Sequence, residues 1–318
     1  MRKALVVGID YYPHLSNLNG CVKDASSVAS VLERNYDGTL NFNIKKALAT
    51  GKDNAVTRAC LEDAISDLFS GTGEIAVFYF SGHGYTENEN GYLITSDSTS
   101  RGRDGVKMED VIEQANKSKI LNKIIILDCC HAGELATMKY FNRVSLVGEG
   151  VTILSACTKG QYALETNGHG IFTSLLVDAL HGGAADIMGN ISPGGVYAYI
   201  DRALGSWSQR PVFKTNVESF ISLRSVKPGL AHSDLMKIDE IFKNPGEVFP
   251  LNPSFEPDSP SPDSNNTKIF AVLQKMESVN LVVPVGEEHM YYAAMNSKGC
   301  KLTPLGLHYW TLVNKKLI

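Results

Sequence analysis

Residues 75–84 read IAVFYFSGHG, an apolar and β-favouring run that ends in a histidine between two glycines. Residues 124–133 read IIILDCCHAG, a second run of the same form that ends in two cysteines. Such runs are typical of buried strands in a parallel sheet. If the two strands are neighbours, about 4.8 Å apart, His83 and a cysteine leave the sheet side by side at its carboxyl edge. Because an imidazole can activate a thiol, the pattern predicts a Cys-His hydrolase.

Strand and helix patterns alternate between Lys3 and about Asn216, which is typical of an α/β protein. The expected strands are Ala4–Ile9, Asn43–Ala47, Ile75–Phe80, Lys123–Leu127, Val151–Ala156 and Pro211–Lys214. The expected helices are Asp24–Arg34, Asn54–Phe69, Met108–Ala115 and Gly170–Leu180. This order predicts a mainly parallel six-stranded sheet with helices on both faces. Pro211 favours an edge position for the last strand, because proline has no N–H for the ladder.

The composition changes after about residue 245, which predicts a second domain. Five prolines mixed with Ser, Asn and Asp between residues 249 and 267 are typical of a linker that packs poorly. The expected division is a catalytic domain over residues 1–245, a linker over residues 246–267 and a small domain over residues 268–318.

The last segment has the pattern of a small module. Apolar residues at helical spacing run through residues 269–276, and short strands are expected at Leu281–Val283 and His289–Ala294. Thr303 followed by Pro304 is typical of a helix start with proline at the first helical position. A winged-helix-like module fits this order, and so does an accessory domain that only stabilises the rest.

The overall composition is ordinary for a globular protein: of 318 residues, 43% are hydrophobic and 20% are charged. A net charge of −4 gives no reason to expect that the whole chain binds nucleic acid. In residues 268–318 basic side chains exceed acidic ones by only six to three, too few to indicate DNA binding. No apolar run is long enough for a membrane span or a signal peptide. We therefore expect a cytoplasmic protein whose six cysteines are free thiols.

Cys129 and Cys130 are both candidates for the nucleophile, but only one can face the crevice because side chains alternate along a strand. If Leu127 and Cys129 continue the buried face, then Asp128 and Cys130 share the opposite side. Buried cysteines are common and inert, so a structural role is open for either one. We expect the N–H groups of Gly84 and Cys130 to form the oxyanion hole for a tetrahedral intermediate.

The segments SGHG at residues 81–84 and DCCHAG at residues 128–133 resemble the metacaspase and orthocaspase branch of the caspase-like cysteine proteases. In that branch the second motif reads Asp-x-Cys-His-Ser-Gly and its third residue is the nucleophile. The resemblance therefore implies that Cys130 is the nucleophile and His83 the general base. Their separation of 47 residues agrees with the spacing of about fifty in caspases. The chain lacks the Gln-Ala-Cys of true caspases, and Ala132 replaces the usual serine.

Further motifs extend the resemblance over roughly residues 1–220. They are Gly20–Ala25, Ser155–Cys157, Gln161–Glu165 and Gly170–Thr173. The resemblance implies a caspase-like sandwich fold. It also implies a protein of the kind that is often bacterial and acts in regulated cell death or defence, including antiviral defence.

Two carboxylates are expected beside the scissile bond. Asp24 follows the first strand and Asp128 lies two residues before Cys130, so both belong to the edge that carries His83. Paired acids attract Arg or Lys and repel Asp or Glu, and Arg fits best because its guanidinium can engage both acids. In the resembling family these positions, with Cys21 and Ser81, line the pocket for the basic residue before the cut. The alternative is that Asp24 is only a helix N-cap and that Asp128 only holds a loop.

No cofactor and no metal site are expected. Many metacaspases bind calcium through acids after the strand that follows the histidine, and Asp97 and Asp104 lie in the corresponding loop. Residues 106–109, however, read VKME where paired acids would be expected. A hard cation needs six to eight oxygens, which this region does not obviously offer. We therefore favour calcium independence. Lys139 and Arg143 follow Cys130 and are candidate self-processing sites.

The favoured interpretation is a cysteine endopeptidase that cleaves protein substrates after Arg or Lys. The C-terminal module would recruit an activator protein or a substrate, and neither a membrane nor nucleic acid is expected as a partner. One alternative is a catalytically silent scaffold of the same fold, which has no need of Cys130 and His83. Others are a DNA-binding regulator driven by the C-terminal module and a Cys-His acyl-transfer enzyme on small molecules, for which paired acids are a poor fit.

Overall fold

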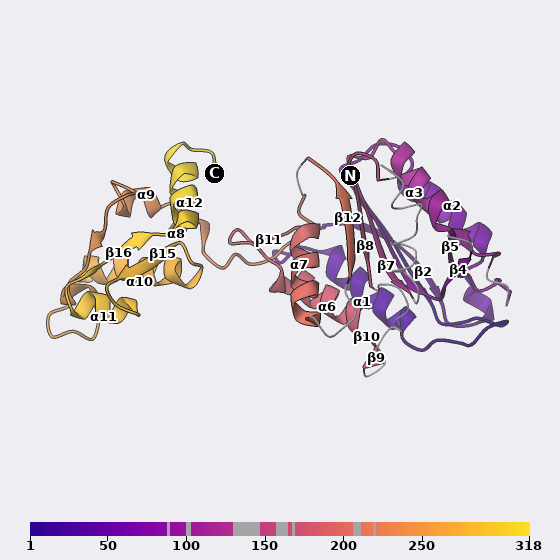
Figure 1. The fold of residues 1–318 in the computed structure, drawn as a ribbon, viewed down its shortest axis with the longest axis horizontal. Coiled ribbons are helices and arrows are strands. Elements are labelled where there is room, and N and C mark those ends of the chain that lie inside the picture. Colours follow the sequence, from indigo (N-terminus) through magenta and orange to yellow (C-terminus); the bar gives the residue numbers. More distant parts are fainter. Residues whose placement is uncertain are drawn as a thin grey trace. The chain divides into compact units, whose positions relative to one another are not determined.

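The computed structural model describes residues 1–87, 90–99, 103–129, 147–156, 165–166, 169–205, 211–218 and 221–318. Cys130, Lys139 and Arg143 lie outside these described residues. The chain forms two compact units, drawn in Figure 1. Unit 1 consists of Met1–Ala185 and Asn190–Lys227, and unit 2 of Asp186–Gly189 and Pro228–Ile318.

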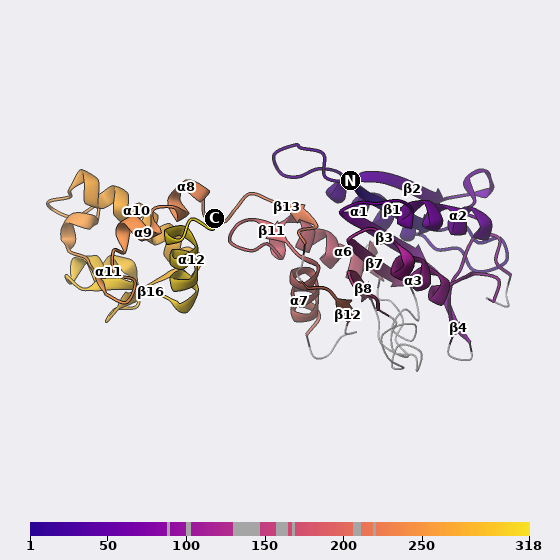
Figure 2. The same ribbon diagram turned by 90° about the horizontal axis from the view of Figure 1, so that it is seen from above.

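A six-stranded sheet forms the centre of unit 1, with the strand order β12-β8-β7-β3-β1-β2 (Figure 2). The strands are β1 (Arg2–Ile9), β2 (Asn43–Ala49), β3 (Ile75–Gly82), β7 (Asn122–Cys129), β8 (Val151–Ser155) and β12 (Val212–Asn216). All neighbours pair in parallel except β12, which is an antiparallel edge strand directly after Pro211. The predicted mainly parallel six-stranded sheet is confirmed, and β3 and β7 are neighbours.

Helices cover both faces of this sheet (Figure 1). Side chains of one phase, such as Leu5 and Val7, pack under α2 (Arg58–Phe69) and α3 (Met108–Lys117). Side chains of the other phase, such as Ala4 and Val6, pack under three helices. These are α1 (Cys21–Glu33), α6 (Ile171–Asp178) and α7 (Pro193–Leu204). Because both faces are covered, every residue of β3 is buried, which explains its unbroken apolar run.

The remaining elements of unit 1 are short and lie outside the central sheet. A small three-stranded sheet follows β3 in the order β4-β5-β6. The short elements are η1 (Lys52–Asn54), β4 (Gly84–Glu87), β5 (Asn90–Leu93), β6 (Val106–Lys107), β9 (Glu165–Thr166), β10 (His169–Gly170), the π-helical turn η2 (Ala179–Gly183), β11 (Asn190–Ile191) and β13 (Arg224–Ser225). In the described part of the chain, no helix combines the length and the hydropathy that crossing a bilayer requires.

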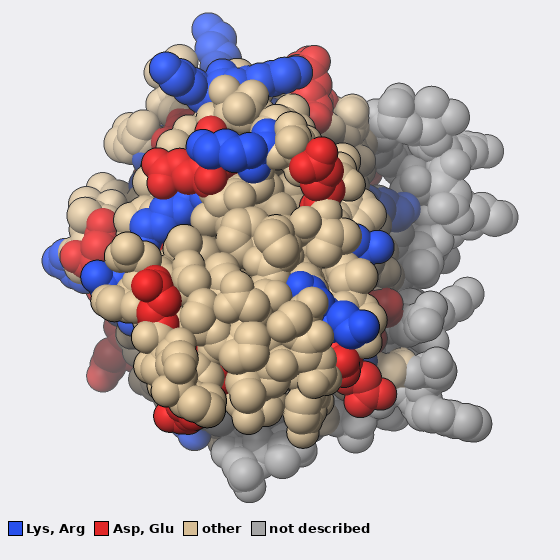
Figure 3. Space-filling model, turned by 90° about the vertical axis from the view of Figure 1, so that its left-hand side faces the viewer, with Lys and Arg blue, Asp and Glu red and all other residues tan. Residues whose placement is uncertain are grey.

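Unit 2 is built on a three-stranded antiparallel sheet in the order β14-β16-β15. Its elements are α8 (His232–Leu235), α9 (Ile238–Ile241), β14 (Phe249–Pro250), η3 (Pro253–Phe255), α10 (Ser264–Ser278), β15 (Val282–Val285), α11 (Met290–Met295), β16 (Gly299–Leu302) and α12 (Pro304–Asn314). The expected helix start is present, because the Thr303 hydroxyl caps α12 by accepting the Gly306 N–H. The face of this unit in Figure 3 shows a broad area of uncharged side chains with charged ones along its margin.

The boundaries of the units differ from the expected division. Unit 1 ends at Lys227 rather than at residue 245, and the segment expected as a linker belongs to the core of unit 2. Phe249 and Phe255 explain the difference, because these residues lie among the prolines. Their rings pack edge to face with centroids 5.9 Å apart. Burial of these rings outweighs the poor packing expected of a proline-rich segment.

The strand expected at His289–Ala294 is wrong, because this segment forms helix α11. Its buried side chains are Met290, Ala293 and Ala294, which recur at the spacing of a helix face. Tyr291 and Tyr292 favour strands by propensity, yet both point outward. The periodicity of burial therefore overrides local propensity here. The winged-helix-like assignment of the module stays a prediction.

Gly8 allows α1 to pack closely on β1, and its replacement tests this contact. A Cβ on Gly8 would lie 2.5 Å from the Cys21 carbonyl oxygen and 2.7 Å from the Ala25 Cβ. We expect Gly8→Ala to lower the free energy of unfolding by about 1–3 kcal/mol through overpacking, measured by urea denaturation. Gly51→Ala is the matched control, since nothing lies within 4 Å of its added Cβ. Equal urea midpoints for the two variants would contradict the close packing.

Candidate active site

Four of the predicted pocket residues come together where β3 and β7 end. Ser81 and Asp128 are direct register partners in these two strands. Helix α1 starts after β1 and brings Cys21 and Asp24 to the same edge. The Cys21 thiol lies close enough to Ser81, Asp24 and Asp128 for all three side chains to affect its pKa. The structure thus brings Cys21, Asp24, Ser81 and Asp128 to one place, on the sheet face that α1 and α6 cover.

Both carboxylates of this cluster are buried, Asp24 with 2% and Asp128 with 7% of its surface exposed. The Gly170 N–H donates to Asp24 Oδ2 at 3.1 Å, and the Thr173 hydroxyl donates to Asp128 Oδ2 at 2.5 Å. A Cβ on Gly170 would lie 2.8 Å from Asp128 Oδ2 and 3.3 Å from Asp24 Oδ2. Both acids therefore meet the N-terminal end of α6, whose dipole stabilises negative charge.

The contacts of the two acids differ from those of a helix N-cap at Asp24 and of a loop-holding residue at Asp128. Gly20, not Asp24, occupies the N-cap of α1. The backbone N–H groups of Cys21 and Val22 are instead met by Asp10, whose Oδ1 accepts them at 2.9 and 3.4 Å. Asp128 contacts a helix distant in the sequence through Thr173, rather than only its own loop.

His83 directly follows β3 and is held by the loop between β1 and α1. Its ring Nε2 lies 2.8 Å from the Ser16 carbonyl oxygen, and its backbone N–H donates to the Tyr12 hydroxyl at 2.9 Å. Since a carbonyl oxygen only accepts, this contact assigns the proton of the neutral ring to Nε2. Nδ1 is then the nitrogen that can accept a proton, as a general base requires.

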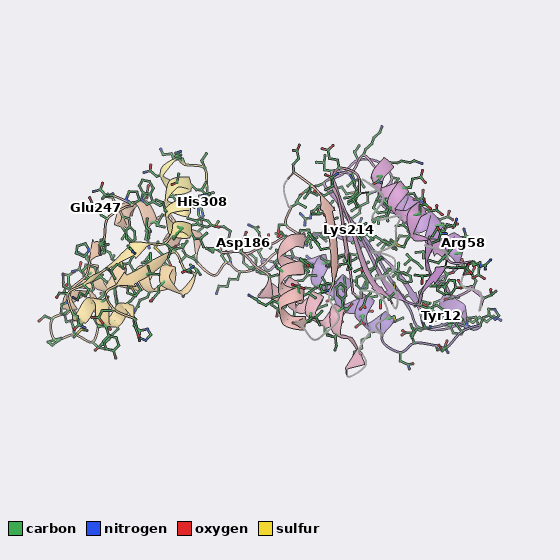
Figure 4. All side chains as sticks on the ribbon, viewed as in Figure 1. Tyr12, Arg58, Asp186, Lys214, Glu247 and His308 are labelled. Carbon is green, nitrogen blue, oxygen red and sulfur yellow. The ribbon has the colours of Figure 1, made fainter. Side chains whose placement is uncertain are left out.

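Tyr12, labelled in Figure 4, is the main side chain of this support. It is buried, with 2% of its surface exposed, and its ring packs on the His83 ring at a centroid distance of 4.7 Å. Burial raises the pKa of the Tyr12 phenol well above its usual range, so the hydroxyl stays protonated. A Cβ on Gly82 would lie 2.5 Å from the Tyr12 hydroxyl, which explains the glycine before His83. The sequence reasoning missed Tyr12 and Ser16, because only the folded loop brings them to the histidine.

Cys129 belongs to the other face of the sheet. It is 2% exposed and packs with Leu127 in the core under α2 and α3, whereas Asp128 lies on the opposite face. The expected alternation of Leu127, Asp128 and Cys129 is confirmed, and its burial leaves Cys129 unsuited to attack a substrate. Cys130 lies outside the described residues, so its role stays a prediction. So does the oxyanion role of Gly84, which begins β4.

The acids of the loop that corresponds to the calcium site of many metacaspases bind groups of the protein itself. Asp97 Oδ1 accepts the Arg58 N–H at 2.9 Å and the Thr95 hydroxyl at 2.7 Å, and Asp104 Oδ2 accepts the Thr99 N–H at 2.7 Å. Asp104 Oδ1 is buried without a hydrogen-bond partner, but one oxygen is far from the six to eight that calcium takes. Within the described ranges, no group of three or more His, Cys, Asp and Glu is placed to hold a metal ion.

Comparison with known proteins identifies a caspase domain in this chain. Residues 1–194 match the family model described as Caspase domain (Peptidase_C14). Metacaspase-1 of Plasmodium falciparum (isolate 3D7) is 27% identical over 158 residues, which are 44% of this chain and 25% of that protein. Metacaspase-3 of Trypanosoma cruzi (strain CL Brener) is 23% identical over 155 residues, which are 43% of this chain and 42% of that protein. The chain therefore matches less than half the length of these relatives.

A solved structure shares the fold. The crystal structure of protein GSU0716 from Geobacter sulfurreducens aligns with a TM-score of 0.52 at 18% sequence identity. The alignment covers 71% of this chain and 99% of that chain. At this level of identity the likeness concerns the fold alone.

Alkylation of the cysteines tests the burial and charge of the described thiols. With iodoacetamide at about pH 8 we expect Cys60, which is exposed, to be modified well before Cys21, Cys129 and Cys300. Burial raises the pKa of the Cys21 thiol far above its usual range and that of Cys300 to about 12, so thiolate is scarce at both. Peptide mapping by mass spectrometry gives the rates. Rapid modification of Cys129 in the folded protein would contradict its burial.

Proposed function

Since this chain belongs to the caspase-domain family, we propose that it is a cysteine endopeptidase that cleaves protein substrates after Arg or Lys. The observation that carries this proposal is the pair of buried carboxylates, Asp24 and Asp128, which meet at Gly170 on the sheet edge beside His83. Two acids enclosed in this way are suited to a cationic side chain and unsuited to an anionic one.

Catalysis would use a Cys-His dyad. His83 Nδ1 takes the proton of the Cys130 thiol, and the thiolate sulfur attacks the carbonyl carbon of the scissile peptide. The oxyanion that forms is stabilised by the N–H groups of Gly84 and Cys130. The imidazolium then gives its proton to the leaving amine, the C–N bond breaks and a thioester remains. Water, deprotonated by His83, then attacks the thioester carbon, the C–S bond breaks and the acid is released. The imidazolium returns its proton to the Cys130 thiolate. The Ser16 carbonyl oxygen fixes the tautomer throughout by accepting a hydrogen bond from the Nε2–H group.

Specificity would follow from the two carboxylates. A guanidinium carries five N–H donors in a plane, so it can bind both acids at once, whereas an ammonium is a single point of charge. We therefore expect Arg to be preferred to Lys at the residue before the cut. An Asp or Glu there would add a third negative charge to the pocket and should not be accepted.

The activity would need no metal and no cofactor, because the described acids of the candidate calcium loop already bind protein groups. Lys139 and Arg143 fit the proposed specificity and are proposed as self-processing sites. A reducing compartment such as the cytoplasm suits the protein, since Cys21, Cys60, Cys129 and Cys300 are free thiols. We place this activity in regulated proteolysis, in cell death or bacterial defence including antiviral defence, in line with the resemblance to metacaspases and orthocaspases.

Unit 2 would bind an activator protein. Tyr291 and Tyr292 of α11 are 45% and 50% exposed and contact each other edge to face. Exposed tyrosines are enriched at protein interfaces, and Figure 3 shows that charged side chains are sparse over a broad area of this unit. A nucleic-acid surface would need basic side chains. On α10, Lys275 is already paired with Asp234 at 2.7 Å.

Hydrolysis of matched fluorogenic peptides tests the proposed activity. We expect cleavage after Arg and Lys but not after Asp, with and without a calcium chelator, and complete loss in Cys130→Ala. Asp24→Asn and Asp128→Asn should each lower kcat/KM for Arg by at least about tenfold, because each removes one charge partner. Cys129→Ala is the matched control and should retain activity, since this side chain faces the core.

Other outcomes of the peptide assay would contradict separate parts of the proposal. Turnover after Asp would overturn the pocket, and loss of activity with chelator would overturn metal independence. An absence of turnover in every reaction would favour the catalytically silent scaffold.

A DNA-binding measurement separates the activator role of unit 2 from the DNA-binding alternative. We expect the full chain to show no binding to a mixed-sequence duplex tighter than about 10 µM at about 50 mM salt, measured by fluorescence anisotropy. The reason is the scarcity of unpaired basic side chains on α10. Tighter binding that weakens steeply at about 200 mM salt would favour the DNA-binding regulator. Loss of that binding in Lys268→Ala, but not in Tyr291→Ala, would assign it to α10.

A further inference from the structure

A buried hydroxyl pair lies directly behind Asp128. Tyr79 is in the middle of β3 and Thr173 is in the first turn of α6, and neither is exposed to solvent. Their side-chain oxygens are 2.6 Å apart, and the Thr173 hydroxyl is 2.5 Å from Asp128 Oδ2. The Tyr79 hydroxyl and the Cys21 thiol also both lie close enough to Ser81 for its hydroxyl to affect their pKa values. Tyr79 thus lies at the centre of a polar network beneath the proposed pocket.

The hydrogen bonds of this network have a fixed direction. Thr173 has a single hydroxyl proton and donates it to the carboxylate, so the Tyr79 hydroxyl must donate to Thr173. Burial and the charge of Asp128 raise the pKa of Tyr79 well above its usual range, so the phenol keeps its proton. The result is a chain in which the Tyr79 hydroxyl donates to Thr173 and the Thr173 hydroxyl donates to Asp128.

The same turn of α6 also holds the second acid. The Gly170 N–H donates to Asp24. Gly170 comes three residues before Thr173, whose hydroxyl donates to Asp128. Two carboxylates close together repel each other, and a free carboxylate would rotate to increase their separation. Bidentate binding of a guanidinium requires each carboxylate plane to keep its orientation. A chain that fixes one oxygen of Asp128 supplies this orientation.

We propose that Tyr79 and Thr173 are positioning residues of the Arg/Lys pocket, and that their hydrogen-bonded chain sets the preference for Arg over Lys by fixing the plane of the Asp128 carboxylate. This inference rests on the proposed function. Binding of a Lys side chain depends less on these hydrogen bonds, since an ammonium group can bind a carboxylate in any rotation of the carboxylate plane. Loss of the chain therefore weakens Arg binding more than Lys binding.

Removal of single hydroxyl groups from the 318-residue protein tests the inference. In Tyr79→Phe and Thr173→Val we expect kcat/KM for Arg peptides to fall by about tenfold, mainly through KM, and the Arg-to-Lys ratio to fall by at least about threefold. Thr173→Ser restores the hydroxyl and should restore the ratio. Thr152→Val is the matched control, because it removes the partly buried hydrogen bond of 2.8 Å between Thr152 and Thr215 without touching the pocket. Its kinetics should be those of the native protein.

Each outcome bears on a different statement. Native cleavage after Arg and Lys with an unchanged ratio in Thr173→Val overturns the inference alone. An equal loss for Arg and Lys through kcat, or the same loss in Thr152→Val, also overturns it, because it indicates a general structural effect. Absence of cleavage after Arg and Lys by the native protein overturns the proposed function and the inference with it. If Tyr79→Phe does not fold, as judged by circular dichroism, the comparison of Thr173→Val with Thr173→Ser decides.

Discussion

The parallel pairing of β3 with β7 is the constraint on which the candidate site depends. Its register runs from Ile75 opposite Asn122 to Gly82 opposite Cys129 without a break. Because side chains alternate, this register sends Ser81 and Asp128 to one face and Cys129 to the other. A shift of one residue would bury the acid among the apolar side chains under α2 and α3 and place a thiol where the acid now lies. Both faces are covered, so the fold penalises such a shift strongly.

The two acids of the polar cluster are compatible with burial because the N-terminal end of α6 donates hydrogen bonds to both. Two buried carboxylates would be costly alone, but helix α6 directs the Gly170 N–H and the Thr173 hydroxyl at them. Helix α1 brings Asp24 to this edge, and its own first N–H groups are met by Asp10. The charges of the cluster are therefore balanced by helix ends and hydroxyl groups that come from distant parts of the sequence.

The sequence predicts the parts of the structure that depend on local pattern. All six strands of the sheet and the positions of His83, Asp24 and Asp128 at its carboxyl edge follow from periodicity and from the order of elements. The residues that support the site could not be predicted in this way, because Tyr79 and Thr173 are 94 residues apart. Tyr79 stands within the apolar run of β3, and nothing in the local sequence distinguishes Thr173. The unit boundary and α11 were also mispredicted, since burial of aromatic rings and small side chains decides them rather than propensity.

The loop between β1 and α1 supports both the histidine and the first turn of α1. Ser16 and Tyr12 hold the histidine, while Asp10, at the start of the same loop, closes the helix that carries the pocket acid. Its backbone is tied at both ends, by the Asp10 N–H to the Ala49 carbonyl and by the Leu18 N–H to the Asp10 carbonyl. Evolution can exchange its exposed side chains freely, but an added or deleted residue would move the base and the pocket together. Loop length, rather than loop composition, is therefore the quantity that homologous chains should hold constant.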